Sequence, residues 1–303
     1  MINKVTAAIL LGALSLVSCG QYHATAPPVE TAANVFESNF FEVTITGQGS
    51  NVILVPGLAS SVEVWNETVD ALSESHMVHT IQVSGFAGTP ARGNAENTDI
   101  LDDLANDLSR YTARLDGETA MIGHSLGGLV TLKTALRDGS AIDRIMIIDV
   151  LPYFSVLMDE TATPEKIAPV AAFMKATLLG QSDEVFSARQ DEALAALVKS
   201  PEDRQIALDW SVASDRTVMA QAMSEVLLTD LRGEVKDIPI RTTVLFANDP
   251  AIPNMEAIRS FYYSDYADLN SVEIIPVDGA LHFIMYDQPE AFEREVSRFL
   301  EGL

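Results

Sequence analysis

The stretch GHSLGG at residues 123–128, which directly follows the apolar residues 119–122, is the feature that most constrains this chain. A serine between glycines suits a buried strand poorly, because its hydroxyl loses water without a packing gain and glycine weakens strands. A helical pattern begins immediately afterwards, at Leu126. Gly123 and Gly127 permit a turn tight enough to lift Ser125 clear of the backbone. The sequence therefore predicts a strand–turn–helix unit that presents the Ser125 hydroxyl.

Apolar runs and helical patterns alternate along most of the chain. Residues 100–115 carry apolar side chains at helical spacing, which predicts a helix packed on a sheet. Alternation of strands with helices is typical of βαβ units and a mainly parallel sheet. The expected strands are residues 41–47, 51–57, 77–83, 119–123, 144–150, 241–247 and 271–277.

The interval 151–235 interrupts this alternation, because it contains several helical stretches and no good strand. An insertion of this length between two core strands is far longer than an ordinary connection. We interpret it as a helical cap, with the core formed by residues 40–150 and 236–303. Methionines in the cap either line an adaptable apolar pocket or simply pack, and the sequence leaves both open; they are Met158, Met174, Met219 and Met223.

A serine hydroxyl is a weak nucleophile and needs a base. His282 is the candidate, because its loop follows the last strand and so reaches the sheet edge where Ser125 is expected. His124 adjoins Ser125, but neighbours in a sharp turn point in different directions, so packing is its expected role. The three remaining histidines precede the turn by a long distance and are His23, His76 and His79.

The base in turn needs a carboxylate that fixes its tautomer. Asp249 follows the penultimate expected strand and is our first choice for this acid. Asp149 ends the strand before the cap and is the alternative. The predicted catalytic residues are therefore Ser125, Asp249 and His282.

The first 20 residues have the pattern of a leader. A 13-residue apolar run from Val5 to Val17 is too short to span a bilayer and is followed by Cys19, the one cysteine of the chain. Residues 16–19, LVSC, resemble the lipobox of bacterial lipoproteins, whose cysteine is lipidated. We expect a signal peptide at 1–18, a tether at 19–39, and a lipid-anchored protein of the bacterial cell envelope, at its outer membrane.

The chain of 303 residues has 43 acidic and 19 basic side chains, a formal charge of −24. This balance argues against a nucleic-acid partner, because a phosphate backbone requires a basic face. It also argues against electrostatic docking on anionic lipid. We therefore expect the lipid anchor to be the only contact with a membrane.

Residues 40–303 resemble the α/β-hydrolase superfamily, in particular its lidded carboxylesterases and proline-iminopeptidase-like members. The resemblance rests on ILVPGLASS at 53–61, SGFAGTP at 84–90, the GHSLGG turn, ANDPAIP at 247–253 and LHFIMYDQPEAF at 281–292. It implies an α/β-hydrolase fold with the order Ser125, Asp249, His282. It also implies an oxyanion hole formed by the amides of Leu58 and Leu126. Departures from the usual pattern at Pro56, Gln82, Ser84 and Leu281 leave the subfamily open.

The expected activity is hydrolysis of small or medium carboxylic esters through an acyl-enzyme on Ser125, with a small-molecule acyl substrate and without a metal or organic cofactor. An amidase, peptidase or lactonase with the same residues is the alternative, and a non-catalytic binding protein is a third. The sequence does not indicate the acyl length or the oligomeric state.

Overall fold

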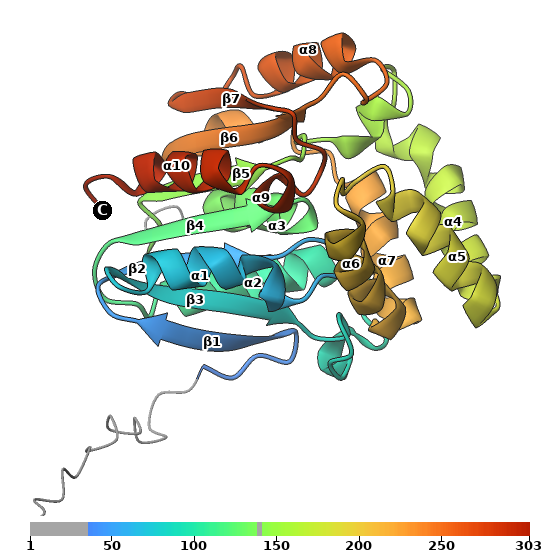
Figure 1. Cartoon of the computed structure of the whole chain (residues 1–303), viewed down its shortest axis with the longest axis horizontal. Coiled ribbons are helices and arrows are strands. Elements are labelled where there is room, and N and C mark those ends of the chain that lie inside the picture. The colour runs from blue at the N-terminus through green and yellow to red at the C-terminus, as the bar shows by residue number, and fades with distance from the viewer. Residues whose placement is uncertain (1–35, 138–140) are drawn as a thin grey trace, which may run out of the picture. The chain divides into compact units, whose positions relative to one another are not determined.

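Seven strands pair into one sheet in the order β1-β3-β2-β4-β5-β6-β7 (Figure 1). β1 pairs antiparallel with β3, and all other neighbours pair parallel. Each strand coincides with an apolar run of the sequence, so the predicted α/β fold with a mainly parallel sheet is confirmed. The strands are β1 (Phe41–Gly47), β2 (Ser50–Val55), β3 (His76–Val83), β4 (Thr119–His124), β5 (Arg144–Ile148), β6 (Arg241–Asn248) and β7 (Val272–Asp278).

This computed structural model describes residues 36–137 and 141–303. The expected signal peptide, the lipidation site Cys19 and most of the tether lie outside the described residues. Within the described part of the chain, no helix combines the length and apolar character needed to cross a bilayer.

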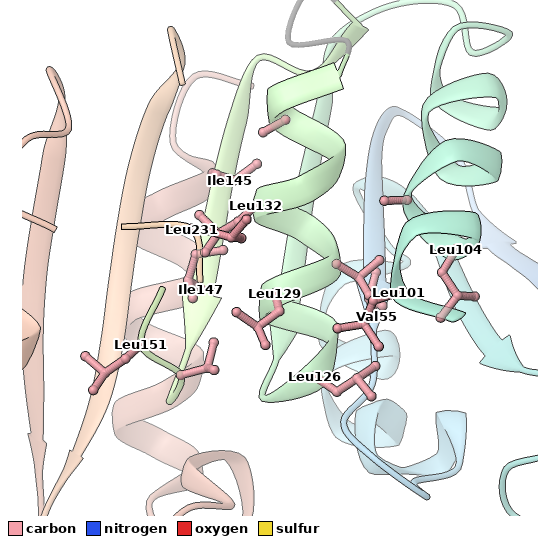
Figure 2. Packing of buried hydrophobic residues seen from close by; sticks show 14 of the residues in the cluster. Val55, Leu101, Leu104, Leu126, Leu129, Leu132, Ile145, Ile147, Leu151 and Leu231 are labelled. Carbon is pink, nitrogen blue, oxygen red and sulfur yellow. The ribbon is translucent and has the colours of Figure 1, made fainter. Parts of the chain in front are cut away.

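Helices cover both faces of the sheet. α2 (Ile100–Thr112), α3 (Leu126–Arg137) and α8 (Met255–Asp265) lie on one face, and α1 (Asn66–Leu72) and α10 (Pro289–Leu300) lie on the other. Figure 2 shows Leu126, Leu129 and Leu132 of α3 among residues of the neighbouring strands and α2. The short α9 (Ile284–Asp287) precedes α10, and 3₁₀ turns occur at Val62–Trp65, Arg92–Asn94, Phe154–Leu157 and Val235–Asp237.

The alternation of side chains along β2 explains the two cores. Ile53 and Val55 belong to the core beneath α2 and α3, whereas Val52 and Leu54 belong to the core beneath α1 and α10. Successive residues of a strand point to opposite faces, so a strand buried on both faces is apolar throughout. This is why the central strands read as continuous apolar runs.

Four helices occupy the interval between β5 and β6, where the sequence predicted helical stretches. They are α4 (Pro164–Gly180), α5 (Asp183–Leu194), α6 (Pro201–Ala213) and α7 (Arg216–Leu228), and they gather at one end of the sheet (Figure 1). Each begins at a side chain that accepts a hydrogen bond from a first-turn amide, which ends the preceding loop sharply. These N-cap residues are Thr163, Ser182, Ser200 and Asp215.

A buried polar network joins β3 to the rest of the core. The side chain of Asn51 donates to the carbonyl of Asp116, which leaves its oxygen to accept from His79 Nε2 at 3.1 Å. His79 Nδ1 lies 2.6 Å from the Tyr111 hydroxyl and must then accept from it. Burial lowers the pKa of His79 to about 4, so the ring is neutral, as this network requires.

We predict that His79 makes stability fall as the pH is lowered. Its folded pKa lies below its ordinary value, so between those two values the unfolded chain binds a proton that the folded chain excludes. The free energy of unfolding in urea, measured at pH 7, 6 and 5, should decrease less steeply for His79→Gln than for the wild type. Equal slopes for His79→Gln and the wild type would contradict this prediction.

Candidate active site

The turn at Ser125 is held in a left-handed backbone conformation. β4 ends at His124 and α3 begins at Leu126, and Ser125 between them has φ 54°. Its amide donates to the carbonyl of Ile148 at 2.8 Å, and its own carbonyl accepts from Gly128 at 2.8 Å. A non-glycine residue with positive φ is uncommon and costs free energy, so it marks a site held by its surroundings.

The glycines of the turn are required by close approach of other backbone atoms. A Cβ at Gly123 would lie 2.2 Å from the carbonyl oxygen of Gly127, and one at Gly127 would lie 2.3 Å from that of Val55. Neither position has room for a side chain. The tight strand–turn–helix unit expected from the sequence is thus explained by the close packing of α3 against β4 at Gly123 and against the end of β2 at Gly127.

His282 lies beside the carboxylate of Asp149. Its Nδ1 is 2.6 Å from Asp149 Oδ2, and both side chains are mostly buried. Nδ1–H donates to the carboxylate, so Nε2 is the nitrogen that carries the lone pair in the neutral ring. An imidazole held in this way can accept a proton from a nucleophile.

The expectation that Asp249 is the partner of His282 is wrong. Asp249 Oδ2 lies 2.6 Å from the Lys199 ammonium group, and Oδ1 accepts from the amide of Ala251 at 2.7 Å. The Lys199 hydrogen bond, followed by that of Ala251, lowers the pKa of Asp249. Both carboxylate oxygens therefore have partners other than the histidine.

Strand order accounts for the choice of Asp149. β5, which ends just before Asp149, is the direct neighbour of β4, which leads into Ser125. Asp149 also has a positive φ, 50°, and its Oδ1 accepts from the amide of Ala247 at 2.8 Å and from the Tyr262 hydroxyl at 3.2 Å. These contacts leave Oδ2 to His282. The sequence offered Asp149 only as the alternative.

His124 packs beside the turn, as expected, and also makes a hydrogen bond to the loop of His282. It is fully buried, and its Nε2 donates to the carbonyl of His282 at 3.0 Å. The two imidazole rings lie 4.6 Å apart, and burial, followed by the effect of His282, lowers the pKa of His124 to about 3. His124 is therefore a neutral hydrogen-bond donor that holds the backbone at His282.

The loop after β2 brings two backbone amides to the same place. A Cβ at Gly57 would lie 3.3 Å from Ser125 Cβ, so the loop approaches the turn closely. Among the described residues, the amides of Leu58 and Leu126 donate to no acceptor, although Leu126 is fully buried. Leu126 is the first residue of α3, where helix amides favour negative charge. The two amides suit the role of an oxyanion hole.

A pocket of about 360 Å³ contains these groups. Its lining is mainly apolar and comes from the sheet edge and the cap. Of the four methionines considered from the sequence, Met174, Met219 and Met223 line it, whereas Met158 does not and is 49 % exposed. Histidines aside, Asp149 is the single ionisable side chain that the described residues contribute to the lining, although the whole chain has a net charge of −24. The site residues in the lining are Leu58, His124, Ser125, Leu126, Asp149 and His282.

Within residues 36–137 and 141–303, no group of three histidine, cysteine, aspartate or glutamate side chains is arranged to hold a metal ion. The groups that the structure does bring together are a serine hydroxyl, an imidazole, a carboxylate and two amides. Together they are able to carry out acyl transfer.

Comparisons with known proteins bear on the family and the fold of the chain. Residues 52–295 match the model of the Alpha/beta hydrolase family. A pimeloyl-[acyl-carrier protein] methyl ester esterase of Aliivibrio fischeri is 23 % identical over 84 % of this chain and 95 % of its own length. A hydrolase from Pseudomonas aeruginosa superimposes with a TM-score of 0.72 at 19 % identity, over 86 % of this chain and 94 % of its own. The enol-lactonase from Burkholderia xenovorans gives 0.67 at 18 %, over 86 % and 96 %.

We predict that Asp149→Asn and Asp249→Asn have very different effects on hydrolysis. The side-chain amide introduced by Asp149→Asn would favour the wrong tautomer of His282, and the corresponding change in serine proteases lowers kcat on the order of 10⁴-fold. Asp249→Asn should retain about a tenth of the activity or more, because Asp249 does not contact the imidazole. Steady-state kinetics on a chromogenic ester would measure both effects. A larger loss of kcat in Asp249→Asn than in Asp149→Asn would show that Asp249 is the catalytic acid.

Proposed function

Because the chain belongs to the Alpha/beta hydrolase family, we propose that it is a serine hydrolase that cleaves carboxylic esters with neutral, apolar acyl groups. The observation that carries the proposal is the contact between His282 and Asp149 in the pocket that also contains Ser125. The strained backbone at Ser125 supports it, because such strain gathers at functional sites.

In the proposed reaction, Ser125 Oγ attacks the ester carbonyl and His282 Nε2 accepts the hydroxyl proton. Asp149 stabilises the resulting imidazolium, and the Leu58 and Leu126 amides donate to the oxyanion. The tetrahedral intermediate then expels the alkoxide, which takes the proton from His282 and leaves as the alcohol. Water attacks the acyl-enzyme with His282 again as the base, and this step releases the acid and restores Ser125.

The proposed substrate class rests on the lining of the pocket. Apolar side chains from the cap surround the site, and the lining carries neither lysine nor arginine to bind an anionic group. Asp149, the one carboxylate that residues 36–137 and 141–303 contribute to the lining, is already paired with His282. A neutral acyl chain fits this environment best, because a buried charge without a partner is costly. The methyl ester esterase among the relatives acts on the same kind of bond.

We predict that Ser125→Ala abolishes turnover of 4-nitrophenyl butyrate while the protein stays folded. Loss of a nucleophile in a catalytic triad lowers kcat by several orders of magnitude. A fluorophosphonate probe should label the wild type at Ser125, as located by mass spectrometry, and should not label the variant. Ser264→Ala, at an exposed serine of α8 that is outside the pocket lining, is the matched control and should behave like the wild type.

A substrate panel separates this proposal from its alternatives. Neutral butyrate and hexanoate esters should have higher kcat/KM than the matching amides, lactones, and esters with a charged acyl group. A preference for amides or lactones would assign an amidase or lactonase with the same residues. Normal turnover by Ser125→Ala, or an unlabelled wild type, would overturn the mechanism.

We also propose that Cys19 carries a lipid that anchors the enzyme to the cell envelope, on the pattern of residues 1–19 alone. Several acyl chains hold a protein at a bilayer far more firmly than one chain does, since each buried CH₂ adds about 0.8 kcal/mol. Wild type expressed with labelled palmitate should carry the label and sediment with membranes. Cys19→Ala should lose the label, and its kinetics on soluble esters should not change. Unlabelled wild type in the soluble fraction would contradict the anchor.

A further inference from the structure

The segment that joins α5 to α6 in the cap lies against the loop that carries His282. The amide of Phe283 donates to the carbonyl of Leu197 at 3.1 Å. The amide of Lys199 donates to Asp287 Oδ1 at 3.0 Å, and Asp287 Oδ2 accepts from the amide of Leu281 at 2.7 Å. Cap and loop are therefore joined on both sides of His282.

The Lys199 side chain extends this contact to a third segment. Its ammonium group lies 2.6 Å from Asp249 Oδ2 and 2.6 Å from the carbonyl oxygen of Gly279. Asp249 follows β6 and Gly279 follows β7, so one cation bridges the ends of two strands from the cap. The side chain of Gln288 also donates to the Gly279 carbonyl, at 3.0 Å.

The exposure of this ion pair indicates what it contributes. The Lys199 side chain is 41 % exposed and that of Asp249 is 10 % exposed. An ion pair this accessible to water adds little to global stability. The two short hydrogen bonds of the Lys199 ammonium group nevertheless hold the first residue of the His282 loop, Gly279, in place. The chain turns at Gly279, which has a φ of 75°.

The position of this loop matters for the proposed chemistry. His282 must keep Nδ1 beside Asp149 while Nε2 meets the substrate side of the pocket. A displacement of about 1 Å in a catalytic group can lower the rate on the order of 100-fold. On the inner side of the loop, His124 holds the His282 carbonyl, and on the outer side Lys199 holds the Gly279 carbonyl.

We propose that Lys199 and Asp249 are positioning residues, which clamp the His282 loop to the cap and so keep the imidazole in register with Asp149. The inference rests on the proposed function, because it assigns these residues a role through His282. Asp249 holds the ammonium group of Lys199 over the Gly279 carbonyl. Asp249, which the sequence suggested as the catalytic acid, thus acts on the reaction indirectly, through Lys199 and the loop of His282.

The test is a kinetic comparison of Lys199→Met, Asp249→Asn and the double variant. Each single change should lower kcat about tenfold and leave KM within about twofold, because the base is displaced and the acyl pocket is not altered. The double variant should be no worse than either single one, since both break the same contact. Lys199→Arg, which keeps a cation at this position, should restore most of the rate.

Arg204→Met is the matched control. Arg204 of α6 pairs with Asp191 of α5 at 3.3 Å, so its ion pair joins the same two cap helices and does not include the His282 loop. Its kinetics should equal those of the wild type. Thermal unfolding of every variant would show whether a rate loss reflects unfolding, and Asp249→Asn serves if Lys199→Met does not fold.

A second measurement does not depend on turnover. The Nδ1 proton of His282, in its hydrogen bond with Asp149, should give a downfield imidazole NMR signal that disappears in Asp149→Asn. The signal should persist in Arg204→Met, broaden or shift in Lys199→Met, and return in Lys199→Arg. Unchanged kcat and an unchanged signal in Lys199→Met would overturn the positioning role. Absent turnover by the wild type would instead overturn the ester hydrolase, while the NMR signal would still test the clamp.

Discussion

The left-handed turn at Ser125 is the constraint on which the arrangement of the site depends. Its φ of 54° is accompanied by a hydrogen bond from the Ser125 amide to Ile148 of β5, and β2 lies so close to the following helix that Gly127 has no room for a Cβ. The same packing sets the first turn of α3 against the loop that carries Leu58. One tight contact between a helix and a strand thus sets the Ser125 side chain and the amides of Leu58 and Leu126 relative to one another. A strained backbone of this kind persists only where the surrounding core overdetermines it.

Asp149, which follows the neighbouring strand β5, also has a left-handed backbone conformation that its surroundings hold in place. β5 adjoins β4, and the turn after β5 directs the carboxylate to the loop that follows β7. The amide of Ala247 and the hydroxyl of Tyr262 take the other carboxylate oxygen, so the acid has a single orientation. Parallel strands that end at one edge bring these distant segments together, as is usual for sites in such sheets.

The pocket differs from the chain as a whole in its charge, because its lining is mainly apolar and the chain is strongly acidic. The chain has 43 acidic residues, and among those in the described part of the chain Asp149 is the only one that lines the pocket, where apolar cap side chains surround it. Hydrogen bonds to a developing oxyanion are stronger in such an environment than in water. The cap contributes this apolar lining, and through Lys199 it also contacts the loop of His282.

The sequence by itself determined the strands of the sheet, the helical stretches between β5 and β6, the turn at Ser125 and the loop that carries His282. Each of these depends on local chemistry: apolar runs form buried strands, glycines permit tight turns, and a loop after a parallel strand reaches a known edge. Only the tertiary structure decided between Asp149 and Asp249, because both follow strands that end at that edge and their local sequences do not show which way the carboxylates point. Asp149 is the partner of His282 because β5, which precedes it, is the neighbour of β4. Asp249 is instead paired with Lys199, which lies 50 residues before it in the sequence. The hydrogen bond from His124 to the His282 carbonyl likewise joins residues 158 positions apart, and such contacts arise only when the strands are assembled.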